Sequence, residues 1–232
     1  MAKKLFLAVV VLMFCCASAF AKTEKFANET ELMTWVTHYY QHPEPKVVDK
    51  AVKDGHELKV LQQNRYVPIL IGFFAGVFQT NKDLRQPIGD LRDSIPLPQV
   101  ERHAILRGLY FSTKNDDPSP LLAKPIDVHK TPLIVDILFG YFYATGDEAA
   151  VKKTIEALPW STMKEEDVKN DEEKKLRREI GIAAKQELTT NAAKHQRVMD
   201  ICKKELPKQS SEVKPILQEV ISQAEKGPVA AK

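Results

Sequence analysis

The chain has 232 residues, of which 44% are hydrophobic and 28% are charged, and its formal net charge is +3. This composition is that of a globular protein and excludes a disordered tail. The small net charge provides no strong field for nucleic acid or for an anionic membrane surface, so we expect no nucleic-acid partner.

Residues 1–21 are predicted to form a secretory signal peptide that is cleaved after Ala21. Two lysines precede an apolar run, Leu5–Cys16, that is short for a membrane span, and Ala19 and Ala21 supply the small residues of a cleavage site. The alternative is a retained anchor helix. Cleavage removes two lysines and no acid, which lowers the net charge from +3 to +1, and leaves Cys202 as the one cysteine. We therefore expect a periplasmic or secreted protein without an intrachain disulfide or a transmembrane anchor.

The stretch VTHYYQHPEP, residues 36–45, contains the first candidate site. On a helix, the spacing of His38 and His42 brings both imidazoles to one face, as in a pair of metal ligands. A zinc-protease motif would need glutamate where Tyr39 stands. His42 also lies just before Pro43, at a helix end, where the dipole favours such side chains. The pair is either a metal site or a helix terminus that presents both histidines to solvent or to a neighbour, and we favour the second interpretation.

Three short stretches match each other at intervals of 32 residues. Each has a glycine, an apolar residue, an aromatic residue and then small polar residues, and they begin at Gly76, Gly108 and Gly140. Apolar residues precede each glycine at helical spacing, and Pro68 and Pro132 each fit the first turn of a helix. Because glycine weakens a helix by about 1 kcal/mol relative to alanine, we expect a neighbouring helix to approach closely at these positions.

The repeating unit is therefore predicted to be a helical hairpin of about 32 residues, a period typical of helical solenoid arrays. Asn28 with Glu31 indicates a capped helix start near the N-terminus, and Asp83 and Asp147 are expected to N-cap second helices of hairpins. Chance similarity within an all-helical protein is the alternative explanation of the matches. We predict an all-α fold, with residues 22–160 forming a helical-hairpin repeat array and no β-strand.

Two later segments depart from this repeat. Residues 116–132 carry four prolines that forbid a long helix, and such a loop is either functional or a spacer. Residues 161–206 are predicted to form one long amphipathic helix that packs on the array, and residues 207–232 a short terminal helix and tail. The apolar stripe of the long helix consists of Ile180, Ala184, Leu188, Ala192, His195, Met199 and Cys202.

Motifs of catalysis are missing from the sequence, which has no G-x-S-x-G elbow, no phosphate-binding glycine loop and no C-x-x-C pair. His195 and Cys202 are seven residues apart, or about 10 Å along a helix axis, so we interpret both as packing residues. We therefore predict no enzymatic activity and no cofactor.

Aromatic residues are more numerous than one thin layer of hairpins must bury. We expect Tyr39, Tyr40, Phe111 and Tyr143 to line a groove that holds a partner, and the alternative is that all of them belong to the core.

The stretches GFFAGVFQTN, residues 72–81, and ILFGYFYATGDEAAVKKTIEAL, residues 137–158, resemble a group of exported bacterial helical proteins of unknown function. They also resemble, more loosely, tetratricopeptide-type helical hairpins, although the W-x-x-L-G-x-x-Y pattern is absent and the period is shorter than that family's. The resemblance covers about residues 28–205. It implies an exported α-helical protein, periplasmic in a bacterium, and brings no active site with it.

The function expected from the sequence is the binding of a protein or peptide partner in the cell envelope. The alternative is a metal- or small-ligand-dependent enzyme that uses His38, His42 and the loop 116–132. The oligomeric state and the identity of the partner stay open.

Overall fold

The computed structural model describes residues 26–95, 99–113 and 132–227. Within these ranges the chain is all-α, as predicted, and contains no strand. The predicted signal peptide and residues 116–131 of the proline-rich loop lie outside the described residues. None of the described helices is long and apolar enough to cross a membrane.

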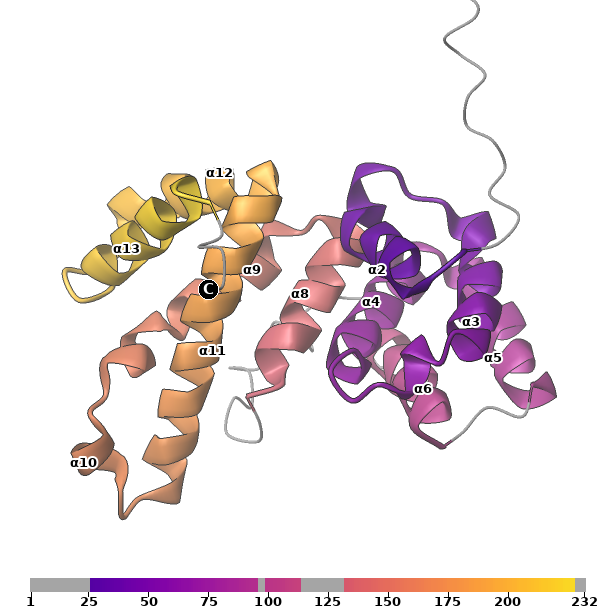
Figure 1. The fold of residues 1–232 in the computed structure, drawn as a ribbon, viewed down its shortest axis with the longest axis horizontal. Helices are drawn as coiled ribbons and strands as arrows, with labels where there is room; N and C mark the ends of the chain where they lie inside the picture. Colours follow the sequence, from indigo (N-terminus) through magenta and orange to yellow (C-terminus); the bar gives the residue numbers. More distant parts are fainter. Residues whose placement is uncertain (1–25, 96–98, 114–131, 228–232) are drawn as a thin grey trace, which may run out of the picture.

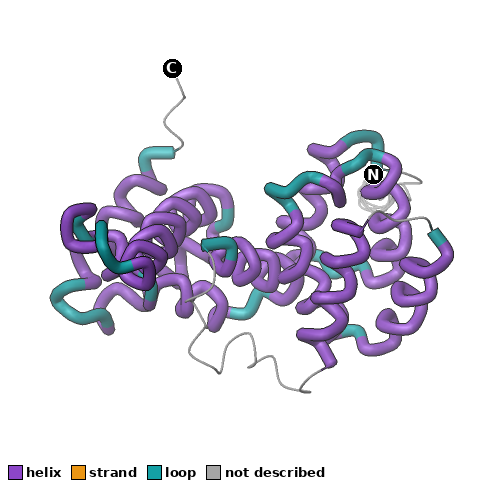
Figure 2. Tube along the Cα trace, turned by 90° about the horizontal axis from the view of Figure 1, so that it is seen from below, coloured by secondary structure: helices purple, strands orange, loops and turns teal. Residues whose placement is uncertain are grey.

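The described helices form two groups on either side of α8 (Figure 1). The first group and its short 3-10 turns are α2 (Glu29–His38), η1 (Tyr39–Gln41), η2 (Pro45–Val47), α3 (Val48–Glu57), η3 (Val60–Gln62), α4 (Val67–Thr80), η4 (Lys82–Leu84), α5 (Arg85–Ser94) and α6 (Gln99–Thr113). The second group follows α8 (Ile134–Thr145) and comprises α9 (Glu148–Glu156), η5 (Leu158–Thr162), α10 (Glu165–Val168), α11 (Glu172–Lys194), α12 (Gln196–Glu205), η6 (Leu206–Lys208) and α13 (Val213–Glu225). The tube in Figure 2 shows the same two groups from another side.

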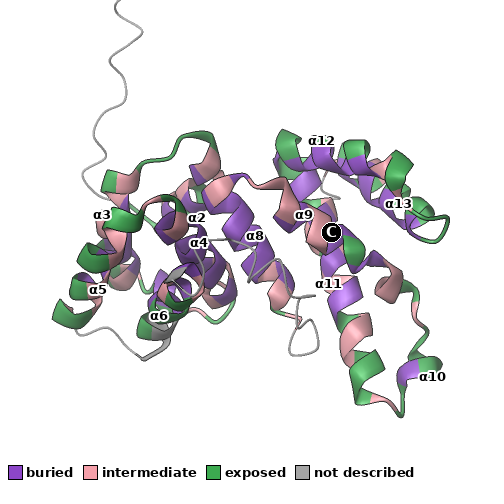
Figure 3. Cartoon of the chain, turned by 180° about the vertical axis from the view of Figure 1, so that it is seen from behind, coloured by how far each residue is buried: buried purple, intermediate pink, exposed green. Residues whose placement is uncertain are grey.

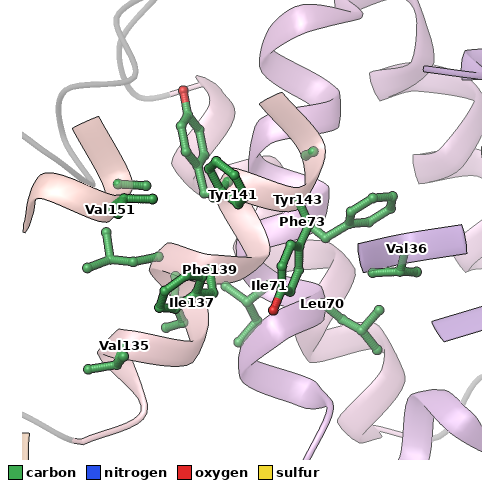
Figure 4. Packing of buried hydrophobic residues seen from close by; sticks show 14 of the residues in the cluster. Val36, Leu70, Ile71, Phe73, Val135, Ile137, Phe139, Tyr141, Tyr143 and Val151 are labelled. Carbon is green, nitrogen blue, oxygen red and sulfur yellow. The ribbon is translucent and has the colours of Figure 1, made fainter. Parts of the chain in front are cut away.

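The most extensive helix contact joins α4 and α8. Both helices are apolar on nearly all sides and almost fully buried, and their side chains form the middle of the core (Figures 3 and 4). Their backbones touch at two glycines. A Cβ added at Gly72 would lie 1.9 Å from the carbonyl oxygen of Ile137, and one at Gly140 would lie 2.0 Å from that of Ile69. The predicted close approach is therefore confirmed at Gly140, and the same holds at Gly76 and Gly108.

The three matching stretches lie on α4, α6 and α8, but these helices are not stacked in chain order. Helix α4 packs against both α6 and α8, and so lies between them. In a linear solenoid each repeat contacts its sequence neighbours, so α6 would lie in the middle. The contacts therefore do not confirm a repeat array.

The predicted caps are confirmed in two of three cases. Asn28 Oδ1 accepts the backbone N–H of Glu31 at 3.0 Å, and Asp147 accepts that of Ala149 at 2.9 Å. Asp83 instead lies within η4 and caps no helix. Pro68 lies in the first turn of α4, whereas Pro132 lies in the turn just before α8.

The predicted single long helix over residues 161–206 is wrong. The segment contains α10, α11 and α12, and His195 interrupts it between α11 and α12 with an extended backbone, φ −123° and ψ 106°. Its N–H still donates to Asn191 O, and its carbonyl accepts the backbone N–H groups of Val198 and Met199 in α12. All seven residues of the predicted stripe are buried, so the stripe is confirmed although two helices carry it.

Candidate functional site

An open cleft of about 690 Å³ lies where the C-terminal ends of α4 and α8 meet the start of α9 and of α12. Such a volume is in the range of ligand sites. Most of the residues that line it have polar side chains; they are Gln79, Thr80, Tyr141, Thr145, Gly146, Asp147, Glu148, Ala149, Lys152 and Arg197.

Hydrogen bonds between lining residues hold the cleft in shape. Gly146 ends α8 in the left-handed conformation, φ 67°, and Asp147 begins α9 directly after it. The exposed Arg197 reaches from α12 to this turn and donates its Nε hydrogen to the Gly146 carbonyl at 2.8 Å. Tyr141 Oη donates to Gln79 Oε1 at 2.8 Å, which ties α8 to α4. The cleft is thus fixed by contacts between three separate parts of the chain.

Two of the charged lining residues, Glu148 and Lys152, form ion pairs with each other and with residues of α12. Glu148 accepts a hydrogen bond from Lys204 at 2.8 Å and lies 3.5 Å from Lys152, which is also 3.5 Å from Glu205. The hydrogen bond from Lys204 is the main cause that lowers the pKa of Glu148 below its usual range. Arg197 has no such acidic partner among the described residues and keeps guanidinium donors for a bound molecule.

A cluster of rings adjoins the cleft behind Gly146. Tyr40, from η1, packs against Gly146, and its Oη lies 3.4 Å from His195 Nδ1. The rings of His38 and His195 are 4.7 Å apart, centre to centre. Burial lowers the pKa of His195 to about 4, with smaller contributions from His38 and Lys194, so its imidazole is neutral at pH 7.

The structure does not bring the predicted pair His38 and His42 onto one helix face. Helix α2 ends at His38, and His42 is an exposed residue that follows η1. Among the described residues, no group of three or more His, Cys, Asp and Glu could hold a metal ion. The imidazole that packs against His38 is instead that of His195, which lies 157 positions further along the chain.

The four aromatic residues expected in a partner groove do not form one surface. Tyr39 and Tyr143 are buried in the core and offer no surface to a partner, whereas Tyr40 and Phe111 are half-buried. Tyr39 packs edge-on against Trp35 and Phe73, and no described residue hydrogen-bonds to its hydroxyl. His195 and Cys202 are buried packing residues, as expected, and burial raises the pKa of the Cys202 thiol to about 12.

A second polar network lies between α8 and α11. Asn191, which is 2% exposed, accepts the Tyr143 hydroxyl hydrogen at 2.5 Å and donates to Glu187 Oε2 at 3.0 Å. Burial raises the pKa of Glu187. Burial also raises the pKa of Asp136 to about 6, and the nearby Glu187 adds to this rise. No sequence motif marks these residues: Asp136 and Tyr143 lie on the apolar α8, whereas Glu187 and Asn191 are two of many polar positions on α11.

The Asp136→Asn variant is expected to be more stable than the wild type at about pH 7.5, by roughly 1–2 kcal/mol. The pKa of Asp136 is higher in the folded state than in the unfolded state, so its contribution to stability is present at acid pH and is lost as pH rises through about 6. A rise in pKa from 3.8 to about 6 would correspond to about 3 kcal/mol, and we discount this value because the side chain is partly exposed. Urea unfolding of both proteins at about pH 4.5 and pH 7.5 measures the difference.

In the wild type and in Asp136→Asn alike, His195 makes stability change with pH in the opposite direction to Asp136. Its folded-state pKa is lowered, so its contribution is lost as pH falls from about 6.5 towards 4. The comparison of wild type with variant cancels this effect. An equal stability difference at both pH values would contradict the assignment of the raised pKa to Asp136, and the exposed Asp200→Asn is the matched control.

Comparisons with known proteins add no relative, since no family model, no curated protein and no solved structure matches the chain.

Proposed function

We propose that this chain is an exported helical protein that binds a protein or peptide partner in the cell envelope, and that the partner contacts the cleft between α4, α8, α9 and α12. The observation that carries the proposal is the arrangement of this cleft. Hydrogen-bond donors from Lys152 and Arg197 stand beside acceptors from Gln79, Asp147 and Glu148. A peptide backbone presents both donors and acceptors, so it can satisfy such a lining along its length.

The balance of charge in the cleft supports a peptide rather than a polyanion. Two basic side chains line the cleft together with two acidic ones. Because these charges cancel, the cleft offers no net attraction to a nucleic acid or a strongly acidic ligand, whereas a neutral or mixed peptide needs none. Arginine is also enriched at protein interfaces, where its planar group makes several directed hydrogen bonds.

Site-specific photo-crosslinking in intact cells of the native host tests the proposal. We expect a photoreactive residue at Gln79 or Thr80, inside the cleft, to give an adduct with a second polypeptide. The same residue at Gln223, an exposed position of α13 outside the cleft, is the matched control and should give none. Arg197→Gln should weaken the cleft adduct. Unmodified monomer from every position, or equal adducts from cleft and control, would overturn the proposal.

The exported location is tested in the same cells. Mass spectrometry of the exported fraction is expected to find the chain beginning at Lys22. An uncleaved chain in the cytoplasmic fraction would contradict export, while leaving the cleft open to a cytoplasmic partner.

A further inference from the structure

Two imidazoles from distant parts of the chain lie side by side at the junction of α2, α8 and the α11–α12 break. The ring centres of His38 and His195 are 4.7 Å apart, and the ring planes are inclined by 43°. His195 is 2% exposed and His38 is half-buried, so the pair lies at the edge of the core.

The hydrogen bonds of His38 fix its tautomer. Its Nδ1 lies 2.9 Å from the carbonyl oxygen of Thr34. A carbonyl only accepts, so Nδ1 carries the hydrogen and Nε2 keeps a lone pair. An imidazole that donates one N–H to a backbone carbonyl and offers the other nitrogen is the usual form of a metal-bound histidine.

His195 has a matching partner in Tyr40. Its Nδ1 is 3.4 Å from Tyr40 Oη, and the same oxygen accepts a hydrogen bond from Gln41 Nε2 at 3.1 Å. When Nδ1 of His195 donates to this oxygen, its Nε2 also keeps a lone pair. Both histidines then offer an unprotonated Nε2.

We propose that His38 and His195 bind one divalent first-row transition-metal ion through their Nε2 atoms, with Tyr40 as the residue that positions His195. The spacing of the rings fits a shared ion. A zinc–nitrogen bond is about 2.0–2.1 Å long and the ring centre lies about 1.1 Å further, so two rings on one ion are roughly 4.5–5.2 Å apart for angles of about 90–110°. The observed separation of 4.7 Å falls within this range.

The pair does not make a closed structural centre. No third His, Cys, Asp or Glu among the described residues completes it, so water or an atom of a bound molecule would have to fill the remaining positions and reach the ion past the half-buried His38. Imidazole ligands suit Zn²⁺, Cu²⁺ and Ni²⁺ better than Mg²⁺ or Ca²⁺. A bound ion would link the end of α2 to the α11–α12 break and stabilise the folded chain by mass action.

Isothermal titration of the purified protein with Zn²⁺ tests the site. We expect one ion per chain, and at least about tenfold weaker binding for His38→Ala and for His195→Phe, which keeps a ring in the core. His42→Ala is the matched control and should bind as the wild type does. Tyr40→Phe should weaken binding by about tenfold, because it removes the group that orients His195.

Thermal unfolding with and without Zn²⁺ gives a second readout. The ion should raise the Tm of the wild type and of His42→Ala but not that of His38→Ala, which changes a half-buried residue and keeps the core intact. If His195→Phe does not fold, His38→Ala and Tyr40→Phe still decide the question. The proposal is overturned if the wild type binds no Zn²⁺, if His42→Ala loses as much affinity as His38→Ala, or if no variant changes the binding.

Discussion

Replacing Gly140 by alanine is expected to destabilise the fold by about 3 kcal/mol or more. The new Cβ would lie 2.0 Å from the carbonyl oxygen of Ile69, 2.8 Å from its carbonyl carbon and 3.0 Å from the backbone nitrogen of Phe73. These atoms belong to the backbone of α4 and not to the end of a flexible side chain, so the helices must separate. Separation would open the largest helix contact of the core. Gly72→Ala makes the reciprocal clash and should have an effect of similar size.

Gly89→Ala is the matched control for both variants. Gly89 lies inside α5, and a Cβ added there would meet nothing within 4 Å. Because alanine favours a helix interior over glycine, this variant should stabilise the protein by about 0.5–1 kcal/mol. Chemical denaturation of the three variants, followed by circular dichroism, measures the free energies of unfolding. Equal effects at Gly140 and Gly89 would show that backbone contact between α4 and α8 does not govern stability.

Local chemistry explains what could be predicted from the sequence. The 32-residue spacing of glycines identified three helices that approach a neighbour closely, since only close contact offsets glycine inside an apolar helix. Asn28 and Asp147 marked helix starts because their side chains accept nearby backbone N–H groups. The order of packing could not be predicted in this way. An internal similarity shows which segments resemble each other, but it does not show which of them pack together, and the contacts place α4 between α6 and α8.

The break at His195 illustrates the limit of periodicity. No proline or glycine lies between Gly181 and Pro207, and the apolar spacing of three to four residues runs through the break without a change of phase. The local sequence therefore favours one helix. The extended backbone of His195 is accompanied by long-range contacts, namely the ring against His38 and the guanidinium of Arg197 on Gly146. The candidate cleft and the histidine pair both depend on this break, so neither could be predicted from the sequence.

Replacing Asn191 by leucine is expected to destabilise the fold by about 2–4 kcal/mol. Leucine has the same branching and the same number of heavy atoms, and it is somewhat bulkier, so it leaves no cavity and the main loss comes from polar groups that are left unpaired. The Tyr143 hydroxyl, in a side chain that is 5% exposed, would lose its acceptor. Glu187 would lose the N–H that Asn191 Nδ2 donates to its carboxylate at 3.0 Å. Each buried polar group without a partner costs about 1–3 kcal/mol.

A double-mutant cycle with Tyr143→Phe separates these losses from a change in packing. Tyr143→Phe alone removes the hydroxyl and leaves Asn191 Oδ1 without its donor. In the double variant both the hydroxyl and the amide oxygen of that hydrogen bond are absent, so neither residue leaves an unpaired polar group there. The free energies of unfolding should then be less than additive, by about 1 kcal/mol or more. Strict additivity would mean that the two side chains act on stability independently, and that α8 and α11 are held together by their apolar contacts alone.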